Sequence, residues 1–211
     1  MRCFVLILFA LFAAPALADE PTVVPWSMSP DLVPWETMTL AADGHREPAR
    51  TFADVARRRG EVRALIDEGT SSPRDTARAM IEMGDLFRDE ARLVLQSDAA
   101  DPWRIPLHTT PAWLQLELAI GWYDQAVQAW PEADPDGRIA LLRAVTMSRL
   151  DRPDDAFAAY ARLIRTYRGT PYVEMAKLAV GDHHLRAGDV DRARTAYKLV
   201  RENRDPELAA Y

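Results

Sequence analysis

The sequence predicts an all-α protein built as a solenoid, a stack of antiparallel helix pairs. Ala119, Ala156 and Ala193 stand 37 residues apart, and each is followed four positions later by a tyrosine. A small residue and an aromatic residue at i and i+4 lie on one face of a helix, so a neighbouring helix can approach there. No segment alternates for long enough to be a strand. The residues expected to pack in this way include Ala119, Tyr123, Ala156, Tyr160, Ala193 and Tyr197.

The first 18 residues predict a signal peptide that is cleaved after Ala18. One arginine precedes an apolar stretch, which ends in the triplet Ala16-Leu17-Ala18. The stretch is too short to span a bilayer, which takes about 20 residues, and no later segment is apolar enough. We therefore expect an exported, periplasmic protein with no transmembrane span in the mature chain. Cys3, the single cysteine, lies within the predicted signal.

Residues 19–47 form a leader rich in proline and tryptophan. The tripeptide Val-Pro-Trp occurs twice, at residues 24–26 and 33–35. Proline at this density excludes a helix and favours an extended chain. The leader is either a flexible segment whose tryptophans pack onto the first helices or a linear motif that binds in a groove.

Residues 48–97 are expected to form a helical hairpin. Apolar residues follow helical spacing from Ala49 to Glu68, and Pro73 opens a second helix that extends to about Gln96. A proline-rich insertion follows at residues 98–111, and the sequence leaves open whether it is a lid or a spacer.

Repeats are expected over residues 112–205, and residues 206–211 read as the start of a further helix. Short breaks between helices force neighbouring helices to run antiparallel. The expected helices span about 112–130, 137–150, 153–167, 171–187 and 189–203.

Residues 174–205 resemble the tetratricopeptide repeat. Gly181, His184, Ala193 and Tyr197 occupy the positions of its glycine, first-helix aromatic, small residue and second-helix aromatic, and Gly188-Asp189 occupies its turn. Gly188 suits a left-handed helix end, and Asp189 can cap the next helix. The match is weaker over residues 137–167, where Arg143 replaces an apolar residue. The resemblance implies a right-handed superhelix with a concave groove lined by the first helix of each pair.

By this resemblance, the groove would bind a protein or peptide partner. The matching positions mix apolar and charged residues, which suits an amphipathic helix or an extended peptide. These positions are Arg138, Leu141, Val145, Arg149, Met175, Leu178, Asp182 and Leu185.

The sequence shows no catalytic, cofactor-binding or metal-binding motif. His183 and His184 are adjacent on a helix and so point about 100° apart, which does not suit a shared metal. The basic run Arg57-Arg58-Arg59 with Arg63 reads as a solvated face. We expect Trp113, Trp122 and Trp130 to pack in the core. With 26 basic and 32 acidic residues, the net charge of −6 argues against nucleic-acid binding.

Two functional hypotheses remain. The layout is similar to that of exported bacterial repeat proteins of the cell envelope, including those of gliding-type motility, which implies a non-enzymatic scaffold or adaptor. The alternative is the helical part of a larger envelope enzyme of the glycan-cleaving type, with its catalytic part beyond residue 211. More repeats after residue 211 would favour the scaffold.

Overall fold

The structure, a computed structural model, describes residues 46–68, 72–97 and 110–201. These residues are all-helical, with seven α-helices, one short 3-10 helix and no strand. The predicted signal peptide, residues 19–45 of the leader, the link at 69–71, residues 98–109 of the insertion and the last ten residues lie outside these ranges. The elements are α2 (Phe52–Asp67), α3 (Pro73–Ser97), α4 (Pro111–Ala129), η3 (Pro131–Ala133), α5 (Arg138–Arg149), α6 (Pro153–Thr166), α7 (Pro171–Arg186) and α8 (Val190–Arg201). Pro111, the last residue of the predicted insertion, is the first residue of α4.

Helix starts follow the chemistry that the sequence indicates. Proline opens α3, α4, α6 and α7, where the missing amide hydrogen has no helical partner in any case. Thr51 caps α2, since its hydroxyl accepts a hydrogen bond of 3.1 Å from the Asp54 amide. Asp134 caps α5, since its carboxylate accepts from the amides of Ile139 and Ala140, both at 2.9 Å.

Gly137 and Gly188 end their turns in the left-handed conformation, with φ of 91° and 76°. Gly188 separates α7 from α8, and Asp189 accepts a hydrogen bond from the Arg192 amide at 3.1 Å, as expected for this turn. At Gly137 an added Cβ would also meet the ring of Tyr167 at 2.8 Å, so the turn before α5 needs glycine for two reasons.

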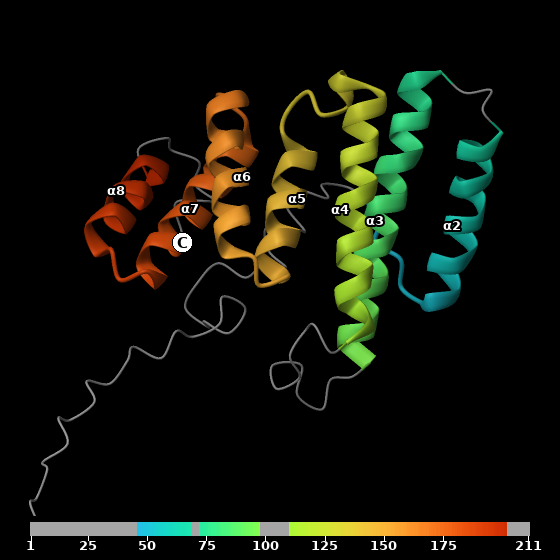
Figure 1. Ribbon diagram of the computed structural model, residues 1–211, viewed down its shortest axis with the longest axis horizontal. Helices are drawn as coiled ribbons and strands as arrows, with labels where there is room; N and C mark the ends of the chain where they lie inside the picture. The colour runs from blue at the N-terminus through green and yellow to red at the C-terminus, as the bar shows by residue number, and fades with distance from the viewer. Residues whose placement is uncertain (1–45, 69–71, 98–109, 202–211) are drawn as a thin grey trace, which may run out of the picture.

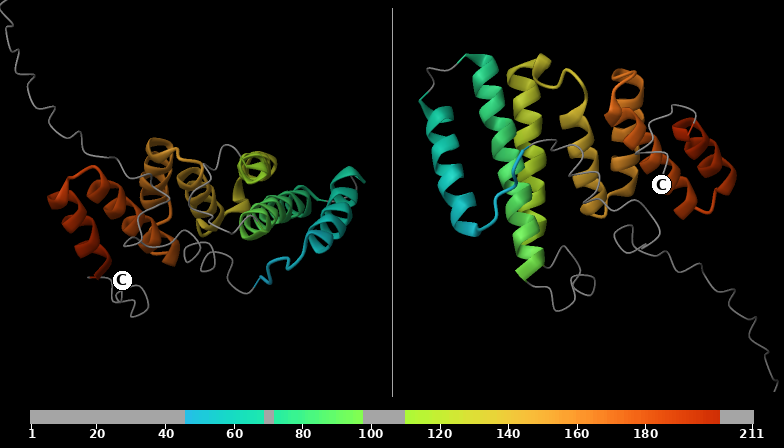
Figure 2. Two further views of the ribbon diagram at one scale, coloured as in Figure 1. Left: turned by 90° about the horizontal axis from the view of Figure 1, so that it is seen from below. Right: turned by 180° about the vertical axis from the view of Figure 1, so that it is seen from behind.

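The helices lie side by side from α2 at one end to α8 at the other, and consecutive helices pack against each other (Figure 1). The views from below and behind in Figure 2 show the same order. One continuous apolar core runs through the row, from Val62 of α2 to Val200 of α8. The long insertion does not change this order, since α3 packs against α4 on the far side of it.

Close contacts between tyrosine and glycine hold two of the helix pairs. A Cβ added at Gly84 of α3 would lie 2.6 Å from Cε1 of Tyr123 in α4. An added Cβ at Gly181 of α7 would overlap Cε1 of Tyr197 in α8 in the same way. Each glycine therefore admits a ring that no larger residue would allow.

The predicted packing residues are placed consistently with that role. Ala119, Tyr123 and Ala156 are fully buried, and Tyr160 and Ala193 are 1% exposed. Tyr197, by contrast, is only half-buried. Arg143, where the resemblance predicts an apolar residue, lies toward the surface and pairs with Asp124 of α4 at 2.7 Å.

Enlarging Ala193 to leucine should overpack the contact between α7 and α8. We expect a loss of about 1–3 kcal/mol in the free energy of unfolding, because a buried methyl position has no room for three more carbons. Urea unfolding of Ala193→Leu measures it, with Arg194→Leu at the neighbouring exposed position as the control. A neutral Ala193→Leu would show that the two helices stand further apart.

Candidate functional site

Three arginines surround Asp85 of α3, which is only 3% exposed. Its carboxylate accepts hydrogen bonds from the hydroxyl of Tyr123 at 2.7 Å and from Arg138 of α5 at 3.0 Å. Arg88 lies 3.4 Å away, and Nε of Arg46 lies 3.6 Å away. One carboxylate thus joins α3, α4, α5 and the segment before α2.

Asp89, one helical turn further along α3, fixes that segment. Its carboxylate accepts two hydrogen bonds from the Arg46 guanidinium, at 2.9 and 3.1 Å, and one from the amide of Ala49 at 2.8 Å. Arg92 donates to the carbonyl of Ala49 at 2.6 Å. A bidentate arginine–carboxylate pair of this kind is among the stronger polar contacts in proteins. We call Arg46, Asp85, Arg88, Asp89 and Arg138 the Asp85 cluster.

The cluster keeps Asp85 ionised. Burial raises the pKa of the Asp85 carboxyl, but Arg138, Arg88 and Arg46 together with the Tyr123 hydroxyl lower it more, and the net pKa is below its ordinary value. Burial, assisted by the nearby Asp85 carboxylate, raises the pKa of Tyr123 far above its usual range, so the phenol stays a hydrogen-bond donor. The Asp85 carboxylate, the arginines and the Tyr123 hydroxyl bind one another and so connect several helices, which is a structural role.

The pH dependence of stability should follow from the lowered pKa of Asp85. The stability that the ionised Asp85 carboxylate contributes is fully present above the unfolded-state pKa of about 3.9. It is lost as the pH falls through the lower folded-state pKa. The stability advantage of the native chain over Asp85→Asn should therefore shrink between about pH 5 and pH 2. Urea unfolding of both proteins at several pH values measures this gap, and a constant gap would contradict it.

A similar arrangement occurs in α7 and α8. The hydroxyl of Tyr197 donates to Asp182 at 2.5 Å, next to the contact between Tyr197 and Gly181. The sequence Gly-Asp at residues 84–85 recurs at residues 181–182. In each case the glycine admits the ring and the aspartate receives its hydroxyl. Reasoning from the sequence found the second glycine but missed the role of both aspartates.

The eight residues predicted to line an open groove are mostly inside the protein. Arg138 is partly exposed and Leu185 is 42% exposed, whereas the others are at most 9% exposed. The physical reason is that α5 and α7 are buried on several sides, not on one stripe. The expected open stripe is therefore corrected for Leu141, Val145, Arg149, Met175, Leu178 and Asp182.

The histidine pair is a packing feature. The ring of His183 stacks on Phe157 of α6 at 4.4 Å between centroids, and His184 meets the same ring edge-on at 5.4 Å. Burial, then the neighbouring His184, lowers the pKa of His183. Across the described ranges, no three histidine, cysteine, aspartate or glutamate side chains come together in a way that could hold a metal ion.

The basic run on α2 is neutralised by ion pairs. Arg57 pairs with Glu61 at 2.9 Å, and Arg63 pairs with Asp67 at 2.9 Å, both within the helix. Arg58 reaches Glu82 of α3 at 2.9 Å, and Arg59 reaches Glu90 of α3. Two of the arginines thus tie α2 to α3, and the interpretation as a purely solvated face holds only for the other two.

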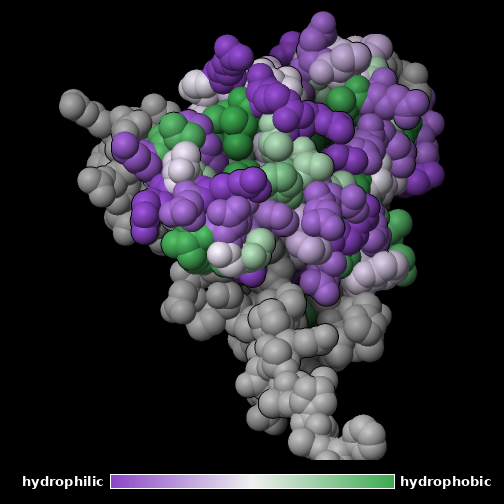
Figure 3. All heavy atoms as spheres, turned by 60° about the vertical axis from the view of Figure 1, so that its left-hand side comes forward, coloured by the Kyte–Doolittle hydropathy of each residue, from purple (hydrophilic) through white to green (hydrophobic). Residues whose placement is uncertain are grey.

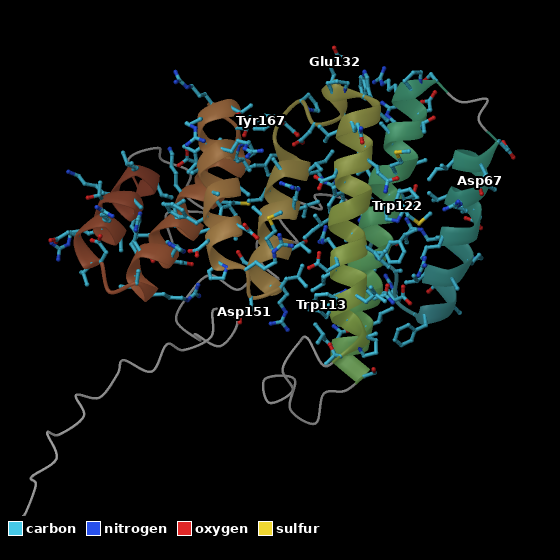
Figure 4. The ribbon with its side chains drawn as sticks, viewed as in Figure 1. Asp67, Trp113, Trp122, Glu132, Asp151 and Tyr167 are labelled. Carbon is cyan, nitrogen blue, oxygen red and sulfur yellow. The ribbon has the colours of Figure 1, made fainter. Side chains whose placement is uncertain are left out.

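An apolar stripe is exposed on α4. Leu114 is 53% exposed and Leu118 is 39% exposed, and Gly121 follows at i+7 with open space where a Cβ would stand. Trp113 beside them is 37% exposed, so the prediction that it packs in the core is wrong. Figure 4 labels Trp113 and Trp122 on this helix. We call Leu114, Leu118 and Gly121 the α4 stripe.

Ion pairs border the α4 stripe on one side. Glu117 meets Arg152 of the α5–α6 turn at 3.4 Å, and Asp124 meets Arg143 of α5. An apolar strip with a charged rim is the usual composition of a protein-binding surface. None of the helices in the described part of the chain is both long and apolar enough to cross a bilayer.

Comparisons of the chain with protein-family models, with curated proteins and with solved structures give no match.

Proposed function

We propose that this chain is a non-enzymatic, exported scaffold that binds a protein or peptide partner in a bacterial cell envelope. The observation that carries the proposal is a repeated contact between helices. A tyrosine recurs three times at the same spacing, and each time it is fully or half buried against the preceding helix. Repeated helix pairs build an extended surface for other proteins. The repeat resemblance agrees with this role.

The contacts of the buried carboxylates support a structural role for them. Asp85, Asp89 and Asp134 are each satisfied by arginines, amides or a tyrosine hydroxyl from the chain itself. Carboxylates used in this way hold helices together. Burial raises the pKa of the Asp134 carboxyl, but both of its oxygens accept hydrogen bonds from backbone amides of α5, so it acts as a helix cap.

We place the partner on the α4 stripe. Its two leucines lie on one helix face at i and i+4, and Gly121 at i+7 allows a close backbone approach. Such a face suits the apolar side of an amphipathic helix or an extended peptide with aliphatic residues.

Site-specific photocrosslinking in cells tests this function. A photoreactive phenylalanine analogue at Leu118 should give a discrete crosslinked protein, whereas the same residue at Arg194, whose side chain is 77% exposed on α8, should not. Leu118→Asp should lower recovery of the same partner without changing the helical spectrum. Equal labelling from both sites, or none from Leu118, would contradict binding at the α4 stripe.

Export makes a separate prediction. The mature protein should begin at Asp19, because a charged start, a short apolar stretch and a small-residue triplet precede it. N-terminal sequencing of protein from the periplasmic fraction measures this. A chain that keeps Met1 and stays in the cytoplasm would contradict both the cleavage site and the location.

A further inference from the structure

Three arginines are gathered around the end of α6. Arg162 and Arg165 lie in the last two turns of the helix, and Arg168 lies in the turn that follows it. All three residues are exposed. The stretch that contains them, residues 156–173, includes no aspartate or glutamate. We call Arg162, Arg165 and Arg168 the α6 arginine patch.

The arginines of α5 provide a comparison. Residues 137–150 likewise carry arginines and no acidic residue. There, however, other helices supply the opposite charge. Arg138 pairs with Asp85 of α3 at 3.0 Å, and Arg143 pairs with Asp124 of α4 at 2.7 Å. Among the residues that the structure describes, no acidic side chain forms an ion pair or a hydrogen bond with the α6 arginine patch.

The acidic residues that flank this stretch in the sequence are used elsewhere. Asp155 lies in the first turn of α6 and pairs with Arg152 at 2.8 Å. Glu174 of α7 is 7% exposed and pairs with Lys177 at 2.8 Å. Within the described ranges, the α6 arginine patch therefore presents positive charge to solvent without a nearby counter-charge.

Helix stability explains only part of this arrangement. A cation in the last turn is favourable because it meets the negative end of the helix dipole, and Arg165 lies there. Arg162 and Arg165 stand at i and i+3, however, where like charges lie side by side and repel each other. An anion bound between them would remove this repulsion. Guanidinium groups form strong, often bidentate hydrogen bonds with carboxylates and phosphates.

The charge of the whole molecule favours a short anionic occupant over an extended one. With a net charge of −6, the protein repels an anionic membrane or a nucleic acid, and basic clusters that bind membranes carry about four to eight lysines and arginines. A short acidic segment of a protein can meet the patch alone. Figure 3 brings the side of α6, α7 and α8 forward and shows hydrophilic side chains over much of its surface.

We propose that the α6 arginine patch binds an acidic segment of a protein partner, whose carboxylates accept hydrogen bonds from the three guanidinium groups. Because the patch is exposed, this binding should weaken as salt screens the charges. The patch belongs to α6 and the α4 stripe to α4. The inference therefore goes beyond the proposed function, and it can hold even if the α4 stripe binds nothing.

A titration followed by nuclear magnetic resonance tests the proposal, with a blocked hexaglutamate peptide as the probe and hexaglutamine as the uncharged control. We expect the backbone amide signals of residues 162–168 to shift with hexaglutamate at about 20 mM salt and much less at about 200 mM salt. Hexaglutamine should leave these signals in place.

Two double variants with the same change in net charge make the test specific. Arg162→Gln with Arg165→Gln should weaken binding of hexaglutamate about fivefold, because two exposed ion pairs with the peptide are lost. The control is Arg192→Gln with Arg194→Gln, since both of these arginines already pair with aspartates on α8 or in the turn before it. It should change the dissociation constant by less than about twofold.

Three results would overturn the proposal. Equal weakening by both double variants would mean that the peptide responds to net charge alone, and unshifted signals at low salt would exclude an acidic segment. Tighter binding to phosphatidylglycerol vesicles than to hexaglutamate, lost in the first double variant, would assign the patch to a membrane surface. Circular dichroism should show the same helix content for all three proteins, because every substituted residue is exposed.

Discussion

Replacing Asp85 by alanine should lower the free energy of unfolding by about 3–5 kcal/mol, because it removes the carboxylate that Arg46, Arg88 and Arg138 share inside the protein. The cost comes mainly from guanidinium groups that lose their counter-charge in a poorly solvated place. Urea unfolding followed by circular dichroism measures it.

Two variants separate this effect from the loss of any surface charge. Asp85→Asn keeps the shape but not the charge, so it should be destabilised nearly as much. Glu61→Ala removes an ion pair with Arg57 whose side chains are about 60% exposed, and it should cost less than about 0.5 kcal/mol. If Asp85→Ala behaved like Glu61→Ala, the cluster would contribute little to stability.

Replacing Tyr160 by alanine should cost about 3–5 kcal/mol, the range seen when a large aromatic side chain is removed from a packed core. Tyr160 is 1% exposed, and its hydroxyl meets Ser148. Tyr160→Phe should cost about 0.5–1.5 kcal/mol, since it removes one buried hydrogen bond and leaves the ring. Thermal or urea unfolding distinguishes the two.

Tyr197→Ala is the matched comparison, because Tyr197 occupies the same position in the next helix pair but is half-buried. Less apolar area is removed from water at Tyr197, so the loss of stability should be clearly smaller than for Tyr160→Ala. Equal losses would contradict the partial exposure of Tyr197.

The helices could be predicted from the sequence because their ends carry local signals. Pro73, Pro153 and Pro171 each start a helix where expected, and Gly188 ends one with the positive φ expected there. Such signals act over a few residues, so no tertiary knowledge is needed to read them.

The candidate surfaces could not be predicted in the same way, because burial depends on neighbours that are distant in sequence. Leu178 and Leu118 look alike on their helices, yet Leu178 is 5% exposed and Leu118 is 39% exposed. Likewise, the sequence around Asp85 does not predict that this residue pairs with Arg46 and Arg138, which lie 39 positions before it and 53 after it. A charged residue in a helix is usually exposed, and Asp85 is buried because three arginines from other parts of the chain and its own helix pair with it.

The contacts of the Asp85 cluster join residues that lie further apart in the sequence than those joined by the contacts of the C-terminal helix pairs. Its hydrogen bonds join residues 43 and 53 positions apart, whereas the tyrosine contacts of α5–α8 join residues 12 and 15 positions apart. Closing a loop costs about 0.6 kcal/mol more for each doubling of its length, and proteins rich in short-range contacts fold faster. We therefore expect the C-terminal helix pairs to order first and the segment at Arg46 to join later, because its contacts with Asp85 and Asp89 close longer loops.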